Sequence, residues 1–440
     1  MSSPDMTDGS PSQASSRPHS ISTTWINLTG LCSFAIALLI LRSTAISDAG
    51  YRNAILMGAI ALPIILLERI FTTVGLRGRF EFCWTRGKIL RVATKLVGVL
   101  ASWLLVLGVF WVFPYFREHS ESVLRLVSRL WLPAFILAPF YIWYVDELVT
   151  EKKDEYWTVG RLVLGQWYQM DKNVVVNHLR EWAVKLFFLQ FILQVLTERS
   201  AYWLTADFQQ IITSHPFGFL DVFTETMYLV DIGFGAVGYL LTLRLFDTHV
   251  RTTEPTVLGW LVCLMCYPPF FGAIDQNFLQ YNDNLYWSQW LGGYAPLQKF
   301  WAALIAVSVA AYALATVQFG IRFGNLSHRG IITNGLYGWL KHPAYVAKNA
   351  SWWLISIPFV STSGVSEAVR LSLMLIMLNT IYYLRAKTEE RHLSWDPTYL
   401  QYSAWIRQHG LWAQMKYGYF AVAEVVTNLF KRWCRLRQRQ

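Results

Sequence analysis

The sequence predicts an all-α integral membrane protein, a polytopic bundle of about ten transmembrane helices. Of its 440 residues, 54% are hydrophobic and only 15% are charged. Soluble domains carry about 25% charged residues, so this chain has too few to cover a water-facing surface. Its 21 Trp and 22 Tyr residues fit the same class, because these side chains concentrate at membrane–water interfaces. A soluble multi-domain enzyme and a disordered protein are therefore excluded.

Ten apolar stretches reach or approach the roughly 20 residues that cross a bilayer. They lie near 28–47, 53–70, 96–116, 126–145, 182–197, 222–246, 256–274, 299–320, 344–360 and 367–386. The fifth and ninth stretches are short, so the number of spans is open by one or two. The first stretch is longer than the apolar part of a signal peptide, which is normally about 7–15 residues, and is therefore interpreted as a span.

Lysine and arginine residues concentrate in the even-numbered connections between these stretches. The second connection holds six of them between Arg77 and Lys95, whereas 275–298 holds none. By the positive-inside rule, both termini and all even connections are predicted to be cytoplasmic. Membrane orientation thus explains most of the net charge of +10, and no nucleic-acid partner is predicted. No targeting feature is evident, which favours a bacterial inner membrane.

The composition changes along the chain and divides it into five parts. They are a disordered cytoplasmic tail, an N-terminal transmembrane block, a central transmembrane block, a polar region with the last two spans, and an amphipathic segment with a basic tail, at 1–23, 24–200, 201–320, 321–416 and 417–440. The basic residues from Lys431 to Arg439 would suit anionic lipid headgroups.

Two carboxylates, Glu225 and Asp231, fall inside the sixth stretch. Carboxylates at membrane depth are costly and usually face a bundle interior or an aqueous cavity. Their spacing places them about 240° apart around a helix, so they do not form a pair. Glu225 fits an interfacial position, whereas Asp231 fits either a substrate cavity or a contact between helices.

Cysteine and histidine spacing gives no metal site. Cys263 and Cys266 have CxxC spacing, but the residues around them are apolar and no second pair exists. We therefore predict a buried helix face rather than a zinc or redox site. His328, His342 and His392 are too loosely spaced to indicate a metal.

The segment 321–349 is the most polar and glycine-rich connection of the chain. Pro343 stands where a new helix would begin, and the N–H groups at a helix start can bind an anionic group. A basic loop with turn glycines would explain the charges of this segment. It would not explain why His, Pro and Tyr are concentrated at 342–345, so we predict a binding site here.

A second polar element, Glu389-Glu390, follows the last apolar stretch. Helical spacing places Tyr382, Arg385 and Glu389 on one face. The pair could be a solvated acidic helix end. Alternatively, one glutamate faces a cytoplasmic cavity, where it would accept hydrogen bonds from ribose hydroxyls or pair with an ammonium group.

Together these motifs resemble the isoprenylcysteine carboxyl methyltransferase and phospholipid methyltransferase families of integral membrane enzymes. The resemblance rests on Gly335-x-Tyr337-x-x-x-Lys341-His342-Pro343-x-Tyr345, on Glu389-Glu390 after a helical hairpin, and on Tyr399 and Tyr402. It covers about 320–410. Leu336, Lys341 and Ala347 depart from the pattern, which usually has Pro, Arg and Gly there. Lysine keeps the charge of arginine but loses its planar fork.

The resemblance implies an S-adenosylmethionine-dependent methyltransferase that binds its cofactor at the cytoplasmic face and acts on a lipidic or prenylated substrate. It implies a cofactor site made of Gly335, Tyr337, His342, Tyr345, Glu389 and Glu390. His342 and Glu390 are the catalytic candidates, because an amine or phenol acceptor needs a base. Asp231, Tyr399 and Tyr402 are candidates for the substrate cavity.

Two alternatives are open. The same C-terminal layout resembles sterol reductases, and Arg322, Arg329 and Lys341 would suit the phosphate of NADPH. Pro343 and Ala344 favour the methyltransferases instead. A non-enzymatic lipid-binding membrane protein is the second alternative.

Overall fold

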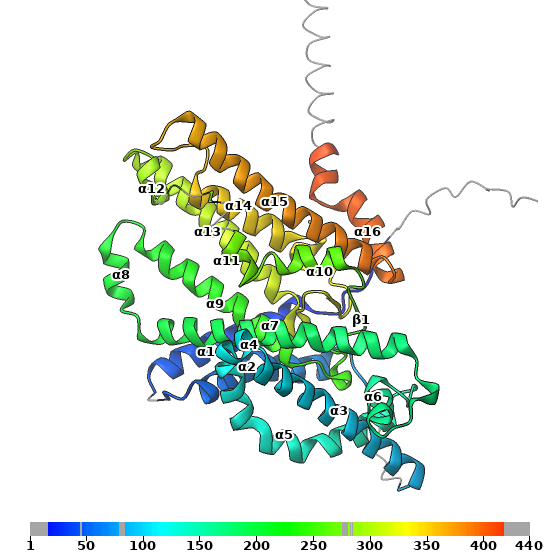
Figure 1. Ribbon diagram of the computed structural model, residues 1–440. Helices are drawn as coiled ribbons and strands as arrows, with labels where there is room; N and C mark the ends of the chain where they lie inside the picture. The colour runs from blue at the N-terminus through cyan, green and yellow to red at the C-terminus, as the bar shows by residue number, and fades with distance from the viewer. Residues whose placement is uncertain are drawn as a thin grey trace, which may run out of the picture.

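The fold is known from a computed structural model of the chain, which describes residues 16–44, 46–78, 84–274, 280, 281, 283 and 285–417. The described residues are almost entirely helical (Figure 1). The first half contains α1 (Thr24–Arg42), α2 (Ala49–Phe71), α3 (Arg86–Val112), α4 (Pro114–His119), α5 (Glu121–Leu148), α6 (Glu155–Val163), η1 (Trp167–Gln169) and α7 (Lys172–Thr205).

The second half begins with α8 (Phe208–Ser214), α9 (Gly218–Leu240), η2 (Arg244–Phe246), β1 (Thr252–Thr253), α10 (Val257–Leu264), α11 (Phe270–Ile274) and α12 (Trp287–Trp290). It continues with α13 (Ala295–Val317), η4 (Gly320–Arg322), β2 (Ser327–His328), η5 (Gly335–Gly338), α14 (Pro343–Ser356), α15 (Val365–Leu393) and α16 (Pro397–His409). In Figure 1, α3, α5 and α6 lie on one side of α7 and α9, and α13 to α16 lie on the other.

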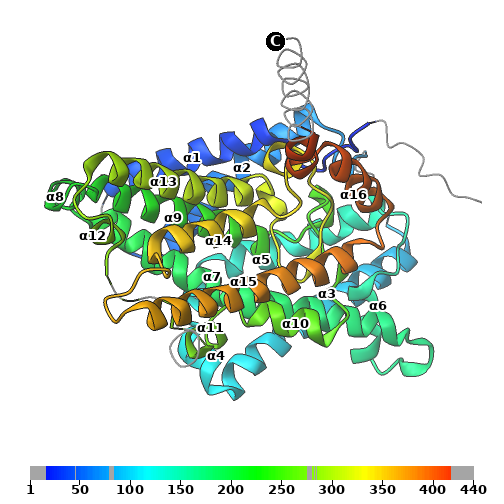
Figure 2. The same cartoon turned by 90° about the horizontal axis from the view of Figure 1, so that it is seen from above.

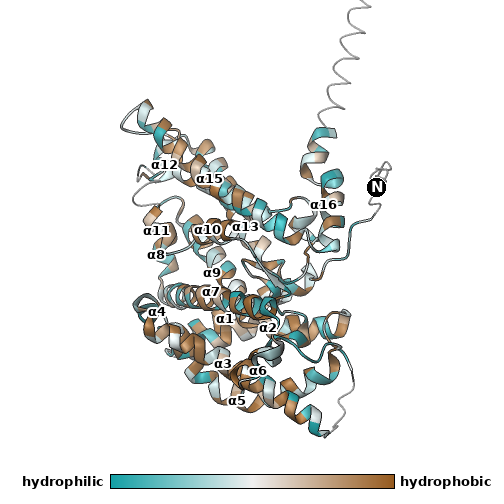
Figure 3. Cartoon of the chain, turned by 45° about the vertical axis from the view of Figure 1, so that its right-hand side comes forward, coloured by the Kyte–Doolittle hydropathy of each residue, from teal (hydrophilic) through white to brown (hydrophobic). Residues whose placement is uncertain are grey.

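Six of the described helices are long and apolar enough to cross a membrane: α1, α2, α3, α5, α13 and α15. They correspond to the first four, the eighth and the tenth of the predicted stretches. Figure 3 shows hydrophobic residues along these helices and hydrophilic ones in α16. The helical, membrane-type architecture agrees with the sequence. A count of about ten spans and the cytoplasmic position of both termini stay predictions.

None of the other four predicted stretches coincides with one of these six long apolar helices. The fifth lies within α7, and the sixth covers most of α9 and continues through η2. Both helices are long but carry charged residues inside them. The seventh is broken into α10 and α11 on either side of the Pro268-Pro269 pair, as expected where proline cannot continue a helix. The ninth is α14, whose 14 residues extend only about 21 Å.

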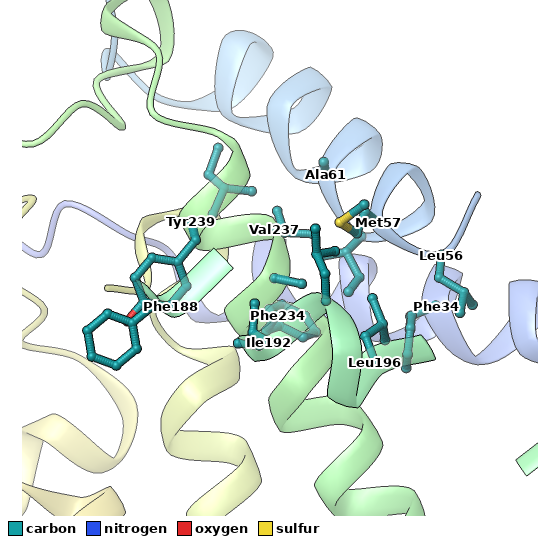
Figure 4. Packing of buried hydrophobic residues seen from close by; sticks show 14 of the residues in the cluster. Phe34, Leu56, Met57, Ala61, Phe188, Ile192, Leu196, Phe234, Val237 and Tyr239 are labelled. Atoms are coloured by element: carbon teal, nitrogen blue, oxygen red, sulfur yellow. The ribbon is translucent and has the colours of Figure 1, made fainter. Parts of the chain in front are cut away.

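The largest hydrophobic cluster joins the N-terminal and central blocks. It includes Phe34 of α1, Leu56 of α2, Phe188 of α7 and Phe234 of α9. Figure 4 shows these side chains converging between the helices. Each of the four is at most 1% exposed, so the two blocks share one core. The predicted burial of the two cysteines is confirmed, since Cys263 on α10 is 2% exposed and Cys266, two residues after the end of that helix, is 7% exposed. Both are free thiols.

The C-terminal helices form a layer over this core. Figure 2 shows α13, α14 and α15 side by side, with α16 beyond the end of α15. One short strand pair departs from a purely helical fold, because Thr252 of β1 pairs with His328 of β2 in antiparallel register. This pair ties the segment after α9 to the polar loop that the sequence singles out.

The predicted tail 1–23 is ordered at its end. The Ile21 N–H donates to the Ile331 carbonyl at 3.1 Å, and the Thr333 hydroxyl donates to the Pro18 carbonyl at 2.8 Å. These two hydrogen bonds to the 331–333 loop hold the end of the tail in place, although the tail has few apolar side chains to bury. Residues 1–15 and 418–440, with the predicted basic tail, lie outside the described residues.

Candidate functional site

Gly335, one of the residues predicted for the cofactor site, determines the backbone conformation of the polar loop at η5. Gly335 has φ +56°, and a Cβ atom there would lie 2.4 Å from Gln318 Nε2. Gln318 Oε1 accepts a hydrogen bond from the Leu336 N–H at 2.9 Å. Only glycine tolerates this conformation and this close approach. Gly335 therefore shapes η5, and it does not line the cavity described below.

Two buried arginines fix the same loop to the core. Arg322 forms a bidentate pair with Glu68 of α2, at 2.7 and 2.9 Å. Arg329 donates to the carbonyls of Gly238, Thr248 and Leu241 at 2.6–2.7 Å. Burial, followed by the nearby Arg322 charge, lowers the pKa of Arg329 to about 9, so the side chain is still protonated at neutral pH. Both guanidinium groups therefore bond to other residues of the protein, Arg322 to a carboxylate and Arg329 to backbone carbonyls.

The helix that follows the loop begins at Pro343, as the sequence predicted. His342 immediately precedes it, and the imidazole stacks on Tyr345 with ring centroids 5.3 Å apart and planes 3° from parallel. The Tyr345 hydroxyl donates to Glu389 Oε2 at 2.8 Å. His342 Nε2 lies 3.3 Å from Glu390 Oε1. The loop motif and the glutamate pair, 44–48 residues apart, thus meet in space.

The two glutamates have different surroundings. Glu390 is close to three cationic or titratable groups: His342, the Lys341 ammonium at 3.5 Å and the Lys387 ammonium at 3.3 Å. It does not line the cavity. Glu389 does line it and accepts the hydrogen bond of Tyr345. Glu389 therefore faces the cavity, whereas Glu390 contacts His342 without lining the cavity.

A cavity of about 120 Å³ lies between the loop, α9, α13, α14, α15 and α16. Among the predicted site residues it is lined by Asp231, Tyr337, His342, Tyr345, Glu389, Tyr399 and Tyr402. Gly335 and Glu390 are the two predicted residues that do not reach it. The structure thus gathers most of the predicted cofactor and substrate residues around one space.

The tyrosines of α16 close one side of this cavity. The Tyr402 hydroxyl donates to the Tyr337 carbonyl at 2.7 Å. The Tyr399 hydroxyl is buried, and it has no hydrogen-bond partner among the described residues. Burial raises the pKa of Tyr399, so this phenol stays neutral and able to donate. A buried donor without a partner is costly, which points to a ligand in the cavity.

The comparison with known families agrees with this geometry. Residues 299–395 match the Isoprenylcysteine carboxyl methyltransferase (ICMT) family. This confirms the predicted resemblance for the C-terminal part, and it supports a membrane methyltransferase in general. The match spans α13, α14 and α15 and includes His342, Tyr345 and Glu389. No curated protein and no solved structure matches the chain.

Asp231, Tyr399 and Tyr402 lie outside the ICMT match but complete its cavity. Asp231 of α9 accepts hydrogen bonds from Tyr312, at 2.5 Å, and from Thr316, both on α13. It therefore connects α9 to α13 and also lines the cavity. This position is compatible with both predicted roles, a helix contact and a substrate cavity. Glu225 instead pairs with Arg199 in a partly exposed position, as expected for an interfacial residue.

Two cationic residues of the ICMT match were missed as site residues. Arg385 donates to Asn325 Oδ1 at 2.6 Å and lies over the Tyr345 ring, 4.9 Å from its centroid. Lys348 lies 5.3 to 5.7 Å from the centroids of three aromatic rings. Helical spacing already placed Arg385 on the face of Glu389, four residues later, without assigning it to the site. The same spacing could have found Lys348, which is three residues after Tyr345.

Proposed function

We propose that this protein is an integral membrane S-adenosylmethionine-dependent methyltransferase that acts on a lipidic or prenylated substrate. The observation that carries the proposal is the convergence of His342, Tyr345 and Glu389 on one cavity within the ICMT match. The positive-inside pattern supports cytoplasmic termini and a cofactor at the cytoplasmic face. The proposed partners are the bilayer, a lipophilic substrate and, at the basic tail, anionic headgroups. The proposed location is a bacterial inner membrane.

The residues of the cavity fit this cofactor. The Glu389 carboxylate could accept hydrogen bonds from ribose hydroxyls, and the unpaired Tyr399 hydroxyl could donate one. The ring of Tyr337, which lines the cavity, is a surface against which an aromatic base could pack. When bound, S-adenosylmethionine would supply a methyl group bonded to its sulfonium sulfur. The chain would position the acceptor in line with the sulfur–methyl bond and exclude water from it.

His342 is the proton acceptor of this proposal. A carboxylate acceptor needs no base, whereas an amine or phenol acceptor would give its proton to the imidazole. Glu390, at 3.3 Å from Nε2, would orient the ring and stabilise its protonated form. Because Glu390 does not line the cavity, its role in this proposal is positioning rather than contact with substrate.

The NADPH alternative loses part of its support in the structure. Arg322 and Arg329 were the basic side chains that suited a nucleotide phosphate. Their N–H groups are instead bonded to Glu68 and to backbone carbonyls. Lys341 donates to the Ser403 hydroxyl at 2.9 Å. A phosphate would have to break these contacts.

Ligand-dependent melting of the purified full-length protein tests the proposal. A ligand that binds only the folded state stabilises it by about 2.7 kcal/mol at a concentration of 100 Kd. S-adenosylmethionine or S-adenosylhomocysteine should therefore raise the melting temperature, and His342→Ala and Glu390→Ala should reduce the rise. Glu367→Ala, at the opposite end of α15, is the matched control. A rise with NADPH alone would contradict the proposal, and no rise with any of them would favour the lipid-binding alternative.

A further inference from the structure

A second cavity lies in the front half of the molecule, entirely outside the ICMT match. Its volume is about 280 Å³, and the residues that line it fall between Lys95 and Val250. They come from α3, α5, α6, α7 and the end of α9 with the loop that follows. The proposed methyltransferase chemistry uses none of these residues.

One end of this cavity is apolar and aromatic. Val106 and Phe110 of α3 and Val123 of α5 line it, and each is at most 6% exposed. Trp103 of α3 meets Trp182 of α7 edge to face, with ring centroids 5.5 Å apart. Such walls suit a hydrocarbon chain, because burying apolar surface is favourable and needs no partner.

The cavity also has a charged part, which begins at Trp182, since the Lys185 ammonium lies 4.9 Å from the centroid of this ring. The charges of this part neutralise one another. Its three cationic side chains pair with its three carboxylates: Lys95 with Asp154, Lys185 with Glu181, and Arg244 with Glu155. Burial lowers the pKa of the seventh titratable group in this part, His249, to about 4, so this imidazole is neutral at pH 7. A charged ligand group would have to break one of these buried pairs, which is strongly unfavourable.

One neutral side chain along the cavity is well placed to bind a ligand. Gln190 of α7 is 2% exposed, lines the cavity and forms no side-chain hydrogen bond within the described part of the chain. Buried polar groups are normally hydrogen-bonded, and an uncharged hydroxyl or carbonyl group would satisfy this amide. Trp182 Nε1 and His249 Nδ1 also have no hydrogen-bond partner there, but Trp182 lies about 12 Å along α7 from Gln190, so one ligand group would not reach both.

The helix that separates this cavity from the outside is suited to lipid entry. No residue of α5 between Leu126 and Val145 is buried, and Pro133 and Pro139 lie within that stretch. Prolines inside a helix bend it, and Figure 1 shows α5 following a curved path. Ala138 and Ile142, on the same stretch, line the cavity. Since α5 is also a candidate span, a ligand could reach the cavity from the bilayer.

We propose that this cavity binds a lipid with an uncharged polar group. The apolar chain lies between α3, α5 and α7, and the hydroxyl or carbonyl group bonds to the Gln190 amide. The charge balance of the polar part of the cavity disfavours an anionic or cationic headgroup, and the neutral amide selects an uncharged one.

Photolabelling of the full-length protein in detergent tests this proposal. The probe is a diazirine-bearing hexadecanol, and the comparison probe is hexadecanoic acid with the same diazirine. The alcohol should label peptides of α3, α5 and α7, excess unmodified hexadecanol should remove the label, and the acid should label these peptides much less. Equal labelling by the acid, label that survives competition, or label confined to other helices would overturn the proposal.

Two variants localise the ligand. Ala138→Trp fills the cavity from α5 and should lower labelling by about tenfold or more, since the bound ligand must fit a concave space. Ala134→Trp, one turn before Ala138 on α5 at an exposed position that does not line the cavity, is the control and should label normally. Unchanged labelling of Ala138→Trp would contradict the proposal.

A third variant covers the case in which Ala138→Trp does not fold. Gln190→Leu keeps the volume similar and removes the polar group, so labelling by the alcohol should fall by about threefold to tenfold, the worth of one hydrogen bond. Its melting temperature in S-adenosylhomocysteine should still rise as in the natural protein. Unchanged labelling of Gln190→Leu would contradict the assigned position of the hydroxyl. Since the readout is the label, the outcome is separate from that of the methyltransferase proposal.

Discussion

The two cavities of this molecule place buried charge in opposite ways. We call the cavity lined by residues between Lys95 and Val250 the front cavity. Each lysine, arginine and carboxylate of its lining forms an ion pair with another lining residue. We call the cavity lined by His342, Tyr345 and Glu389 the back cavity. Among the described residues, its Tyr399 hydroxyl has no hydrogen-bond partner, and its Lys348 ammonium lies near three aromatic rings and forms no ion pair. Both cavities contain polar groups without a hydrogen-bond partner, so neither cavity size nor an unpaired polar group identifies the methyltransferase site. A charged side chain without an ion pair, such as Lys348, distinguishes the two.

The largest expected effect comes from the contact that joins the two halves. Glu68→Ala removes the carboxylate that pairs with Arg322, whose side chain is 1% exposed. Removing one partner of a buried ion pair costs about 3–5 kcal/mol, because the other charge is left buried. The free energy of unfolding should fall accordingly in denaturant titrations. Glu121→Ala, which breaks an exposed pair with Arg125, is the control. Equal losses in the two variants would show that the halves do not depend on this contact.

The next effect concerns the carboxylate that faces the back cavity. Glu389→Gln keeps the size of the side chain but removes its charge. A hydrogen bond to a charged group is worth about 1.5–3 kcal/mol, so the affinity for S-adenosylmethionine should fall by about tenfold to a hundredfold. Equilibrium binding measures it. Glu367→Gln, at the far end of the same helix, should bind normally, and unchanged binding by Glu389→Gln would remove this residue from the site.

A matched pair of tyrosines sharpens the meaning of an unpaired group. Tyr402→Phe loses the hydrogen bond to the Tyr337 carbonyl and should lose about 1 kcal/mol of stability without ligand. Tyr399→Phe loses a hydroxyl that has no partner in the described structure, so its stability should be equal or slightly higher. Its affinity for S-adenosylmethionine should nevertheless fall. A loss of stability in Tyr399→Phe that matches that of Tyr402→Phe would contradict the assignment of this hydroxyl to a ligand.

The smallest effect is a pH dependence at the loop. Burial lowers the pKa of His328 to about 4 from its usual 6.5, against the opposing charge of Asp396. The unfolded chain therefore binds a proton at a higher pH than the folded one, and stability should decline as the pH falls from about 6.5 toward 4. Melting temperatures at pH 7.5 and 5 measure this decline. His328→Gln should make it shallower, whereas the exposed His409→Gln should not. An equally steep decline in His328→Gln would contradict the shifted pKa.

Helix type and membrane character could be predicted from the sequence, because apolar length and charge scarcity are local properties. Each of the six apolar helices overlaps its predicted stretch, although α3 begins ten residues earlier and α15 ends seven residues later than predicted. What the pattern could not supply is how interrupted stretches fold. The segment 344–360 is apolar enough for a span, but α14 ends at Ser356, where Ile357 turns into the left-handed region at φ 45°. That turn depends on tertiary packing, since Ile357 is 1% exposed.

The candidate site could be predicted where the motif order alone brings residues together. His342, Tyr345 and Glu389 meet as expected because a helical hairpin returns the chain to its starting face. The roles of Arg322 and Arg329 could not be predicted, since their partners lie 254 and 81–91 residues away. A charged side chain has the same local pattern whether it faces a ligand or a backbone carbonyl. Only the fold distinguishes the two.

The central claim is that the back cavity binds S-adenosylmethionine. Equilibrium binding of radiolabelled S-adenosylmethionine to the full-length protein in lipid nanodiscs tests it most directly. We expect saturable binding at one site. S-adenosylhomocysteine should displace the bound S-adenosylmethionine, NADPH should not, and Glu389→Gln should weaken the binding. Absence of saturable binding, or displacement by NADPH, would contradict it.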